Sequence, residues 1–401
     1  MVSFFKRQIA EGKDMDHKRY SSFRLYTLAQ CLYWVCGCAV VSFAVVYLRD
    51  KGFSQSQAGL ICSAAAGLSF LLTGALSALM DSGRVGPAAL GSGLFGLAAL
   101  SLLVVRLDVR AALLTAILYA LAIAAMQTAV FFYNKLYADL SYLGIPLDFG
   151  IARGLGSVSF SLASFSFGML IRDLGSRFLP GIAAALAVLQ LGCVLALCRK
   201  ARGADHTERK SAPKNGSLFR FLREHRRFTR FLIGASLISA SNMTFTTFLI
   251  HITERAGGSP GTLGVLNAYM ALIEIPVMLC YSRIRARVSL RTLVAIGLAF
   301  YCMKLWGFTL SVNLPLLFLA ATMHALSFGL FTPAAVDYVK DSVPQADSAK
   351  GQGLMVSTPV LFSCVTLAVF GALLDHLGLV TAFCLFSSLS LLGLLLCLLS
   401  V

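Results

Sequence analysis

The amino-acid sequence predicts an all-α membrane protein with twelve transmembrane helices in two six-helix bundles. Composition is the first observation behind this prediction, because the 401 residues are 58% hydrophobic and only 13% charged. A soluble domain carries about 25% charged residues, so the usual solvated surface is missing. The second observation is that apolar runs recur along the whole chain. Their length of roughly 18 to 25 residues allows a helix to cross a bilayer.

Twelve such runs can be placed in order. We expect helices over residues 22–48, 56–80, 87–105, 111–132, 148–171, 178–198, 228–252, 262–282, 290–309, 314–336, 351–374 and 379–400. The longest polar stretch lies between the sixth and seventh runs and holds ten basic residues. We therefore predict four regions: a cytoplasmic N-terminal tail (1–21), an N-terminal bundle (22–198), a basic cytoplasmic linker (199–227) and a C-terminal bundle (228–401).

The net charge of +16 is concentrated in short segments between the apolar runs. This placement does not predict a nucleic-acid partner, and it is typical of the Lys and Arg excess in cytoplasmic loops of membrane proteins. With the N-terminus in the cytoplasm, that side holds about 24 Lys and Arg and the opposite side about seven. The asymmetry predicts an integral protein of the plasma (inner) membrane with both termini cytoplasmic.

An internal repeat is the third observation. Gly52-Phe-Ser-Gln-Ser-Gln-Ala-Gly59 precedes the second helix, and Gly257-Gly-Ser-Pro-Gly-Thr-Leu-Gly264 precedes the eighth in the same spacing. Two further segments, 168–175 and 371–378, match in the same way at the ends of the fifth and eleventh helices. Parallel six-helix repeats place a binding site near the bilayer midplane, between the halves.

Four ionisable side chains fall within the predicted helices: Arg153, Glu274, Lys304 and His324. Such groups cost roughly 2.5 to 3.5 kcal/mol each on insertion scales, so they suggest function. Arg153 could instead face the cytoplasm, Glu274 could form a structural ion pair with Lys304, and His324 could be a neutral core residue. Together they predict a centre that leans positive and suits an anionic or acceptor-rich solute. Glu274 is the candidate for carrying a proton, with His324 beside it.

Other side chains within the helices are candidates for lining a cavity: Tyr133, Phe160, Trp306 and Asn242. For the aromatic residues, core packing or lipid contact is the alternative. A dinucleotide-like run, Gly91-Ser-Gly93-Leu-Phe-Gly96, lies in an apolar helix, where small residues serve close helix packing. The sequence contains no Walker loop and no readable pairing of nucleophile and base. We therefore expect no enzyme activity, no cofactor and no metal.

Several stretches resemble one transporter family. Asp148-Phe-Gly150-Ile-Ala-Arg153-Gly-Leu-Gly156-Ser157 is similar to a signature at the start of helix five, and Ala271-Leu-Ile-Glu274-Ile-Pro276 is similar to the family's helix eight. The chain resembles the major facilitator superfamily over nearly its whole length. Within that superfamily, it resembles the branch of sugar and nucleoside proton symporters that includes lactose permease.

The resemblance implies roles for individual residues. Arg153 falls where the branch has its sugar-binding arginine, Phe160 where it has a stacking tryptophan, and His324 where it has the coupling histidine. Lys304 falls on a functional arginine of helix nine. The chain departs from the pattern at Ser327, where a carboxylate is expected. The lactose permease mechanism therefore does not transfer unchanged.

The resemblance also implies gating residues at the cytoplasmic side: Asp81, Arg84 and Asp148. Asp81 and Arg84 belong to a degraded form of the superfamily's loop motif, which loses its first glycine and keeps the acid and a base. Asp148 opens the signature at helix five. We expect these residues to stabilise one closed state.

The sequence therefore predicts a secondary active transporter, a permease that moves a small polar or anionic organic solute by alternating access. Proton-coupled symport and facilitated carriage both remain open. Two other functions also remain open: a multidrug or metabolite exporter of the same fold, and a non-transporting membrane receptor or lipid-binding protein. We expect a small-molecule substrate, a lipid environment and a monomer.

Overall fold

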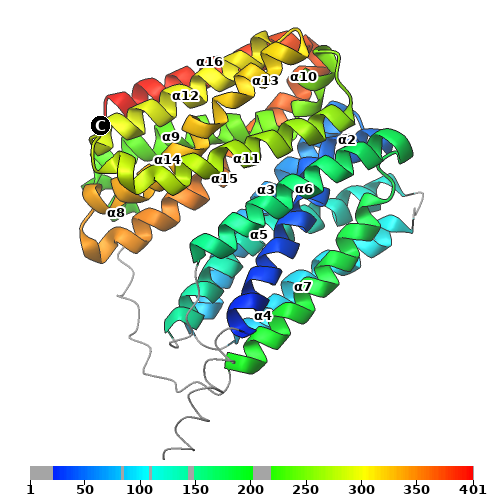
Figure 1. The fold of residues 1–401 in the computed structure, drawn as a ribbon, viewed down its shortest axis with the longest axis horizontal. Coiled ribbons are helices and arrows are strands. Elements are labelled where there is room, and N and C mark those ends of the chain that lie inside the picture. Colours follow the sequence, from blue (N-terminus) through cyan, green and yellow to red (C-terminus); the bar gives the residue numbers. More distant parts are fainter. Residues whose placement is uncertain (1–20, 83–84, 108–110, 143–148, 202–217, 401) are drawn as a thin grey trace, which may run out of the picture.

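The computed structural model describes residues 21–82, 85–107, 111–142, 149–201 and 218–400, and these residues form an all-helical protein (Figure 1). Within these ranges, eleven helices are long and apolar enough to cross a membrane, and a bent helix pair brings the number to twelve. The predicted fold class is thereby confirmed. Residues 1–20 of the predicted N-terminal tail and residues 202–217 of the predicted linker lie outside the described residues.

The first half contains the span Ser21–Ser42, which ends in the π-helix η1 (Cys38–Ser42), then α2 (Ala44–Asp50), α3 (Gln55–Ser82), α4 (Pro87–Arg106), α5 (Ala112–Tyr142), α6 (Phe149–Leu174) and α7 (Leu179–Ala201). The second half contains α9 (Arg226–Thr247), α10 (Leu249–Arg255), α11 (Pro260–Arg285), α12 (Leu290–Leu310), α13 (Leu314–Thr322), α14 (His324–Ser342), the 3₁₀ turn η2 (Gln345–Asp347), α15 (Ser348–Leu377) and α16 (Leu379–Leu398). In Figure 1 the first half lies at the lower right and the second half at the upper left.

A short helix, α8 (Leu218–Glu224), lies in the segment that we predicted to be a polar linker. Its Phe221 is buried, and Phe221 and Phe228 meet edge to face with ring centroids 5.9 Å apart. The linker prediction missed this helix because one buried aromatic residue among many charges gives a weak periodic pattern.

Large apolar side chains cover much of the outer surface. Leu71, Leu113 and Leu279 are each exposed by more than half. A soluble protein rarely exposes such extended apolar surface, whereas lipid solvates it favourably. The chain is therefore an integral membrane protein.

The internal repeat is visible in the backbone. Gly52 and Gly257 both adopt positive φ angles, 86° and 85°, at the turn before α3 and before α11. Only glycine adopts this conformation without steric cost. The equivalent residues in the two halves therefore form the same turn.

Both halves begin with a helix that breaks at an equivalent residue. The first span breaks at Phe43 (φ −106°, ψ 16°), and α9 breaks from α10 at Phe248 (φ −100°, ψ 14°). The bend between α9 and α10 is 58°. The sequence predicts one continuous helix at each place, over residues 22–48 and 228–252.

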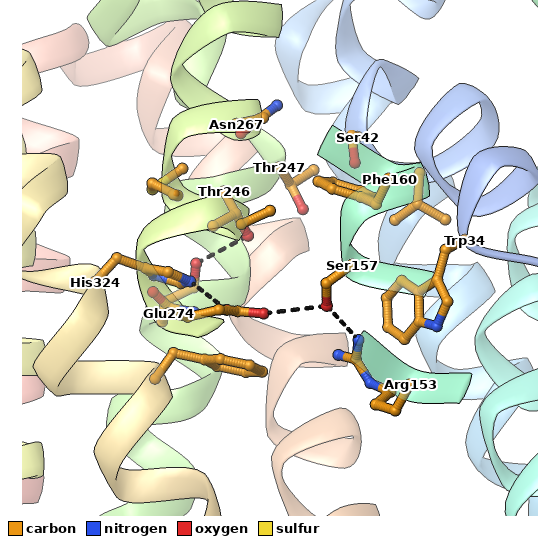
Figure 2. Close-up of a pocket in the computed structure, with 15 residues that line it drawn as sticks. Trp34, Ser42, Arg153, Ser157, Phe160, Thr246, Thr247, Asn267, Glu274 and His324 are labelled. Atoms are coloured by element: carbon orange, nitrogen blue, oxygen red, sulfur yellow. Dashed lines mark hydrogen bonds and ion pairs between the residues drawn. The ribbon is translucent and has the colours of Figure 1, made fainter. Parts of the chain in front are cut away.

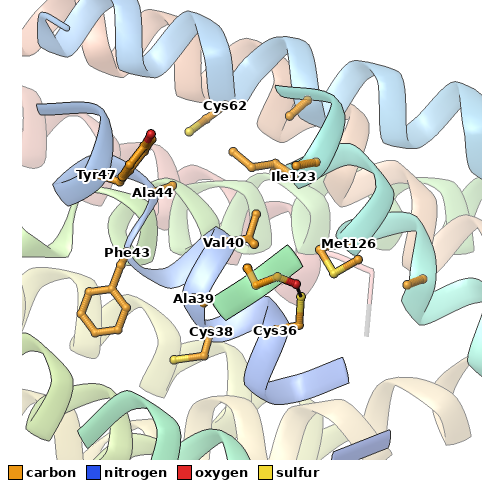
Figure 3. Close-up of a cluster of buried hydrophobic side chains, with 14 of the residues drawn as sticks. Cys36, Cys38, Ala39, Val40, Phe43, Ala44, Tyr47, Cys62, Ile123 and Met126 are labelled. Atoms are coloured by element: carbon orange, nitrogen blue, oxygen red, sulfur yellow. Dashed lines mark hydrogen bonds between the residues drawn. The ribbon is translucent and has the colours of Figure 1, made fainter. Parts of the chain in front are cut away.

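Side chains support the break in the first half. The carbonyl of Val40, within η1, accepts a hydrogen bond from the Tyr119 hydroxyl at 3.0 Å. Apolar side chains, including Phe43, Tyr47 and Cys62, surround the segment (Figure 3). Because a buried carbonyl needs a partner, Tyr119 stabilises the altered backbone.

Two antiparallel helix pairs, α3 with α15 and α6 with α11, connect the halves. We call the end that holds the α2–α3, α6–α7, α10–α11 and α15–α16 connections the far end. There, a Cβ atom on Gly59 would lie 3.1 Å from the Cα of Gly371, and one on Gly168 would lie 2.7 Å from the Cα of Gly264. These are equivalent contacts in the repeat, so the two pairs close the far end in the same way.

An ion pair also joins the halves at the far end. Arg49 donates two hydrogen bonds of 2.6 Å to the carboxylate of Glu254, and the two residues are 205 positions apart, the spacing of the repeat. At the same end, the Ser56 hydroxyl donates to Asp375 at 2.6 Å. These contacts stabilise the form in which the far end is closed.

We expect a weak energetic coupling between Arg49 and Glu254. Their side chains are 32% and 35% exposed, so solvent screens the pair. A double-mutant cycle with Arg49→Ala and Glu254→Ala, measured by thermal unfolding in detergent, should give a coupling of about 1 kcal/mol or less. A coupling of several kcal/mol would contradict this expectation.

Candidate functional site

A cavity of about 300 Å³ lies between the two halves. Its lining residues come from both: Trp34, Val41, Ser42, Arg153, Ser157, Phe160, Asn242, Thr246, Thr247, Asn267, Met270, Ala271, Glu274, His324 and Phe328. Ligand pockets typically measure roughly 300 to 1,000 Å³, so this cavity suits a small solute.

Three ionisable side chains of the second half form a continuous chain of contacts. Lys304 Nζ lies 3.1 Å from His324 Nδ1, and His324 Nε2 lies 3.2 Å from Glu274 Oε2. An ammonium group only donates, so with Lys304 charged, Nδ1 accepts and Nε2 carries the hydrogen that Glu274 accepts. A neutral histidine thereby connects a cation to a carboxylate.

The two charges in this chain of contacts, on Lys304 and Glu274, are both buried, which is energetically costly. Lys304 is completely buried in α12, and Glu274 is buried in α11. The ammonium group of Lys304 also lies 4.8 Å from the ring centroid of Tyr301. A buried charge is tolerated only when it is paired and hydrogen-bonded. Each of the two charges therefore depends on the other through His324.

The chain of contacts continues across the interface through Ser157. The Ser157 hydroxyl lies 3.4 Å from Glu274 Oε1, and Arg153 donates to the same hydroxyl at 2.6 Å (Figure 2). Arg153 and Ser157 lie on successive turns of α6, in the first half. The four ionisable residues that the sequence singled out thus come together, with Ser157 as the link between the halves.

An aromatic wall orients Arg153. The guanidinium lies 4.0 Å from the centre of a Trp34 ring, and Trp34 contacts Phe160 edge to face with ring centroids 6.3 Å apart. Trp34 packs so closely against Gly156 that a Cβ there would lie 2.9 Å from the indole Nε1. Across the cavity, Phe328 stacks on His324 at 5.3 Å. The cavity therefore has apolar walls beside a charged end.

Four other side chains were predicted to line the cavity, and the structure places two of them there. Phe160 and Asn242 line the cavity. Tyr133 is buried behind its wall, 5.5 Å from the ring of Tyr33, which itself contacts Trp34. Trp306 lies in α12 and is not among the lining residues. Solute binding by any of these four stays a prediction.

Of the three predicted gating residues, only Asp81 lies in the described part of the chain. Asp81 lies one residue before the end of α3. Arg84 and Asp148 lie outside the described residues. Their role in closing the cytoplasmic side stays a prediction.

Several lining residues were not predicted as site residues: Ser42, Ser157, Thr246, Thr247, Asn267 and Phe328. Ser157 belongs to the helix-five signature, which could have suggested it. Asn267 is an amide in a strongly apolar run, and such residues usually face the interior of a bundle. Ser42, Thr246 and Thr247 lie next to helix breaks that the sequence pattern does not reveal.

Sequence comparison identifies a family and one curated relative. Residues 28–385 match the MFS_1 like family. The relative is the "Uncharacterized transporter YwbF" of Bacillus subtilis (strain 168), 25% identical over 200 residues, which cover 49% of this chain and 48% of that protein. The match thus spans about half the length of this relative.

Solved structures of transporters share the fold. The nucleoside transporter NupG superposes with a TM-score of 0.77 at 16% identity, covering 96% of this chain and 98% of NupG. The human organic anion transporter MFSD10 (TETRAN) gives 0.60 at 19% identity, covering 95% and 99%. A peptide transporter POT variant gives 0.67 at 13% identity, covering 94% and 93%. With a family match over most of its length and a transporter fold, the chain belongs to the MFS_1 like family of transporters.

Proposed function

We propose that this protein is a secondary active transporter that moves a small anionic organic solute by alternating access and couples the movement to protons through Glu274. One observation carries the proposal. Arg153 lines the cavity with a single hydrogen bond, to Ser157, and its other N–H groups have no hydrogen-bond partner in the described part of the chain. A guanidinium with open donors is suited to bind a carboxylate.

The charges around the cavity support the proposal that the solute is an anion. Lys304 and Arg153 are cations, Glu274 is a carboxylate, and His324 is neutral in the arrangement described above. The group therefore carries one excess positive charge in a low-dielectric setting. An anionic solute would neutralise that charge, and electrostatic attraction would favour its entry.

The contacts between the halves support alternating access. The far end is closed by paired glycine contacts and by Arg49 with Glu254, while the cavity lies between the halves and is lined by α6 and α11 of the second glycine pair. Parallel-repeat transporters work by rocking one bundle against the other around such a site. One chain supplies both walls of the cavity, so a monomer suffices in this proposal. The excess of Lys and Arg on one side supports a cytoplasmic position for both termini.

The relatives are compatible with this substrate class. MFSD10 is an organic anion transporter, and NupG is a nucleoside transporter. At 19% and 16% identity these likenesses show the shared fold. The charged end of the cavity is the reason to favour an anion over a neutral nucleoside.

Counterflow in proteoliposomes tests the proposal. With labelled carboxylates, nucleosides and sugars as the panel, we expect exchange of carboxylates. Arg153→Gln should lower carboxylate counterflow by roughly 10- to 100-fold, because losing one partner of a buried charge pair costs about 2 kcal/mol or more. Arg172→Gln, an exposed arginine at the far end of the same helix, is the matched control.

Two results would contradict the anion site. One is normal carboxylate counterflow in both Arg153→Gln and Lys304→Ala. The other is exchange of organic cations and dyes without any exchange of carboxylates, which would favour the exporter. Ligand binding without counterflow of any compound would favour a receptor.

A further inference from the structure

We propose that the cavity contains a second, uncharged subsite at the two helix breaks, which binds a neutral hydrogen-bonding group of the solute, such as an amide or hydroxyl. We define this subsite by Ser42, Asn242, Thr246, Thr247 and Asn267. The inference rests on the proposed function for the anionic end of the solute at Arg153. It adds that the solute is bipartite, with a charged end and a neutral polar end.

The two breaks bring equivalent residues of the halves to one place. Ser42 directly precedes the break at Phe43, and Thr247 directly precedes the break at Phe248. Both line the cavity. Broken transmembrane helices and π-helical turns often mark binding sites, because non-helical backbone at membrane depth is tolerated where it lines a cavity.

The threonine hydroxyls present acceptors. Thr246 donates to the carbonyl of Met243 at 2.9 Å, and Thr247 donates to the same carbonyl at 2.8 Å. Each hydroxyl hydrogen is therefore used within α9. The oxygen lone pairs remain available to a donor on the solute, since a hydroxyl accepts as well as donates.

The two asparagines are the main evidence for a ligand. Asn267 lines the cavity, is only 8% exposed, and its side chain has no hydrogen-bond partner in the described part of the chain. The Oδ1 atom of Asn242 is buried without a partner among the described residues as well. Buried amides are nearly always hydrogen-bonded, so the unpartnered side chain of Asn267 at the cavity wall indicates a group that completes it, and the Oδ1 atom of Asn242 needs a partner too.

Ser42, Thr247 and Asn267 of the subsite lie opposite the charged end, and Asn242 lies between the two ends, more than one turn before Thr247 on α9. Asn267 and Glu274 are two helical turns apart on α11, which is about 10 Å along the axis. In Figure 2, Ser42, Thr247 and Asn267 lie toward one end of the cavity, and Arg153 lies at the other. Between them the lining is mostly apolar, with Phe160, Met270 and Ala271. A planar or apolar core with a carboxylate at one end and a neutral polar group at the other fits this order.

Three matched probes test the subsite. 4-Carbamoylbenzoate carries both groups, 4-methylbenzoate lacks the amide, and 4-methylbenzamide lacks the carboxylate. The chain has only two tryptophans. In a Trp306→Phe background, the remaining indole is Trp34 at the cavity wall, so quenching of its fluorescence measures binding without requiring transport.

We expect 4-carbamoylbenzoate to bind about 10-fold more tightly than 4-methylbenzoate, because its amide adds one or two well-placed hydrogen bonds. Asn267→Leu and Asn242→Leu should each reduce this ratio by weakening 4-carbamoylbenzoate, and retained quenching by 4-methylbenzoate shows that the variant is folded. Asn267→Ala replaces Asn267→Leu if the latter does not fold. Arg153→Gln should weaken both carboxylates equally and leave the ratio unchanged.

The subsite is wrong if the asparagine variants keep the full ratio, if the two carboxylates bind equally in the Trp306→Phe protein, or if none of the probes quenches Trp34 at about 10 mM. Failure of the proposed function gives a different result, namely binding of 4-carbamoylbenzoate with the expected ratio but no counterflow of it in proteoliposomes.

Discussion

Glu274→Gln should abolish solute uptake driven by a pH gradient and leave solute counterflow in place. Glutamine has the shape of a protonated glutamic acid but cannot release a proton. Exchange of solute for solute needs no net proton movement, whereas uptake against a concentration gradient does. Both are measured in proteoliposomes with an imposed pH gradient, using a carboxylate from the counterflow panel.

The matched control is Glu224→Gln, which changes an exposed carboxylate on α8, paired at 2.7 Å with Arg220. It should leave both activities unchanged. Gradient-driven uptake that persists in Glu274→Gln would remove Glu274 from the coupling mechanism and would leave the anion site unaffected.

Glu274→Gln should also destabilise the protein, because it leaves the ammonium group of Lys304 buried without a carboxylate. Removing one partner of a buried ion pair costs about 3 to 5 kcal/mol. Adding Lys304→Met removes the remaining charge, so the double variant should recover much of the lost thermal stability in detergent. An equally unstable double variant would show that the two charges do not depend on one another.

The second large effect is expected at Gly264. A Cβ atom there would meet the backbone oxygen of Ser164 and would lie 2.8 Å from the Cα of Gly168, closer than real Cβ contacts. Backbone atoms cannot give way as a flexible side chain does, so Gly264→Ala should force α6 and α11 apart. An overpacked contact costs about 1 to 3 kcal/mol, which corresponds to roughly a 5- to 150-fold shift toward a form opened at the far end.

Spin labels at Leu174 and Leu377, exposed residues of the two halves at the far end, would measure this opening in a cysteine-free background. The distance distribution should move to longer values in Gly264→Ala. Gly74→Ala is the control, because a Cβ on Gly74 meets no atom within 4 Å. An unchanged distribution in Gly264→Ala would show that this glycine contact does not limit closure.

The sequence predicted the fold well because bilayer thickness imposes a length on each apolar run. It also singled out the four buried ionisable residues, since their insertion cost makes them rare. Trp34 and Trp306 show that the sequence does not tell which aromatic residues face the cavity. Both are tryptophans in apolar helices, yet only Trp34 lines the cavity. A helix that is apolar on all sides carries no periodic signal for the face that looks inward.

The two helix breaks also could not be predicted from the sequence. No proline lies at either break, at Phe43 or at Phe248. At the first break the support is tertiary, as the hydrogen bond from Tyr119 to the carbonyl of Val40 shows. Propensity and hydrophobic pattern describe each helix by itself and cannot report such support from a neighbour.

The matching breaks also bear on how this protein diversified. Phe43 and Phe248 share both residue type and backbone angles, as expected if one duplicated ancestor already had the bend. At the positions equivalent to Asn242 and Asn267, the first half instead has Gly37 and Cys62. The two halves therefore share the bent architecture and differ in the amides, which only the second half carries at these positions. New solute preferences could evolve by changing a few side chains while the duplicated framework stayed the same.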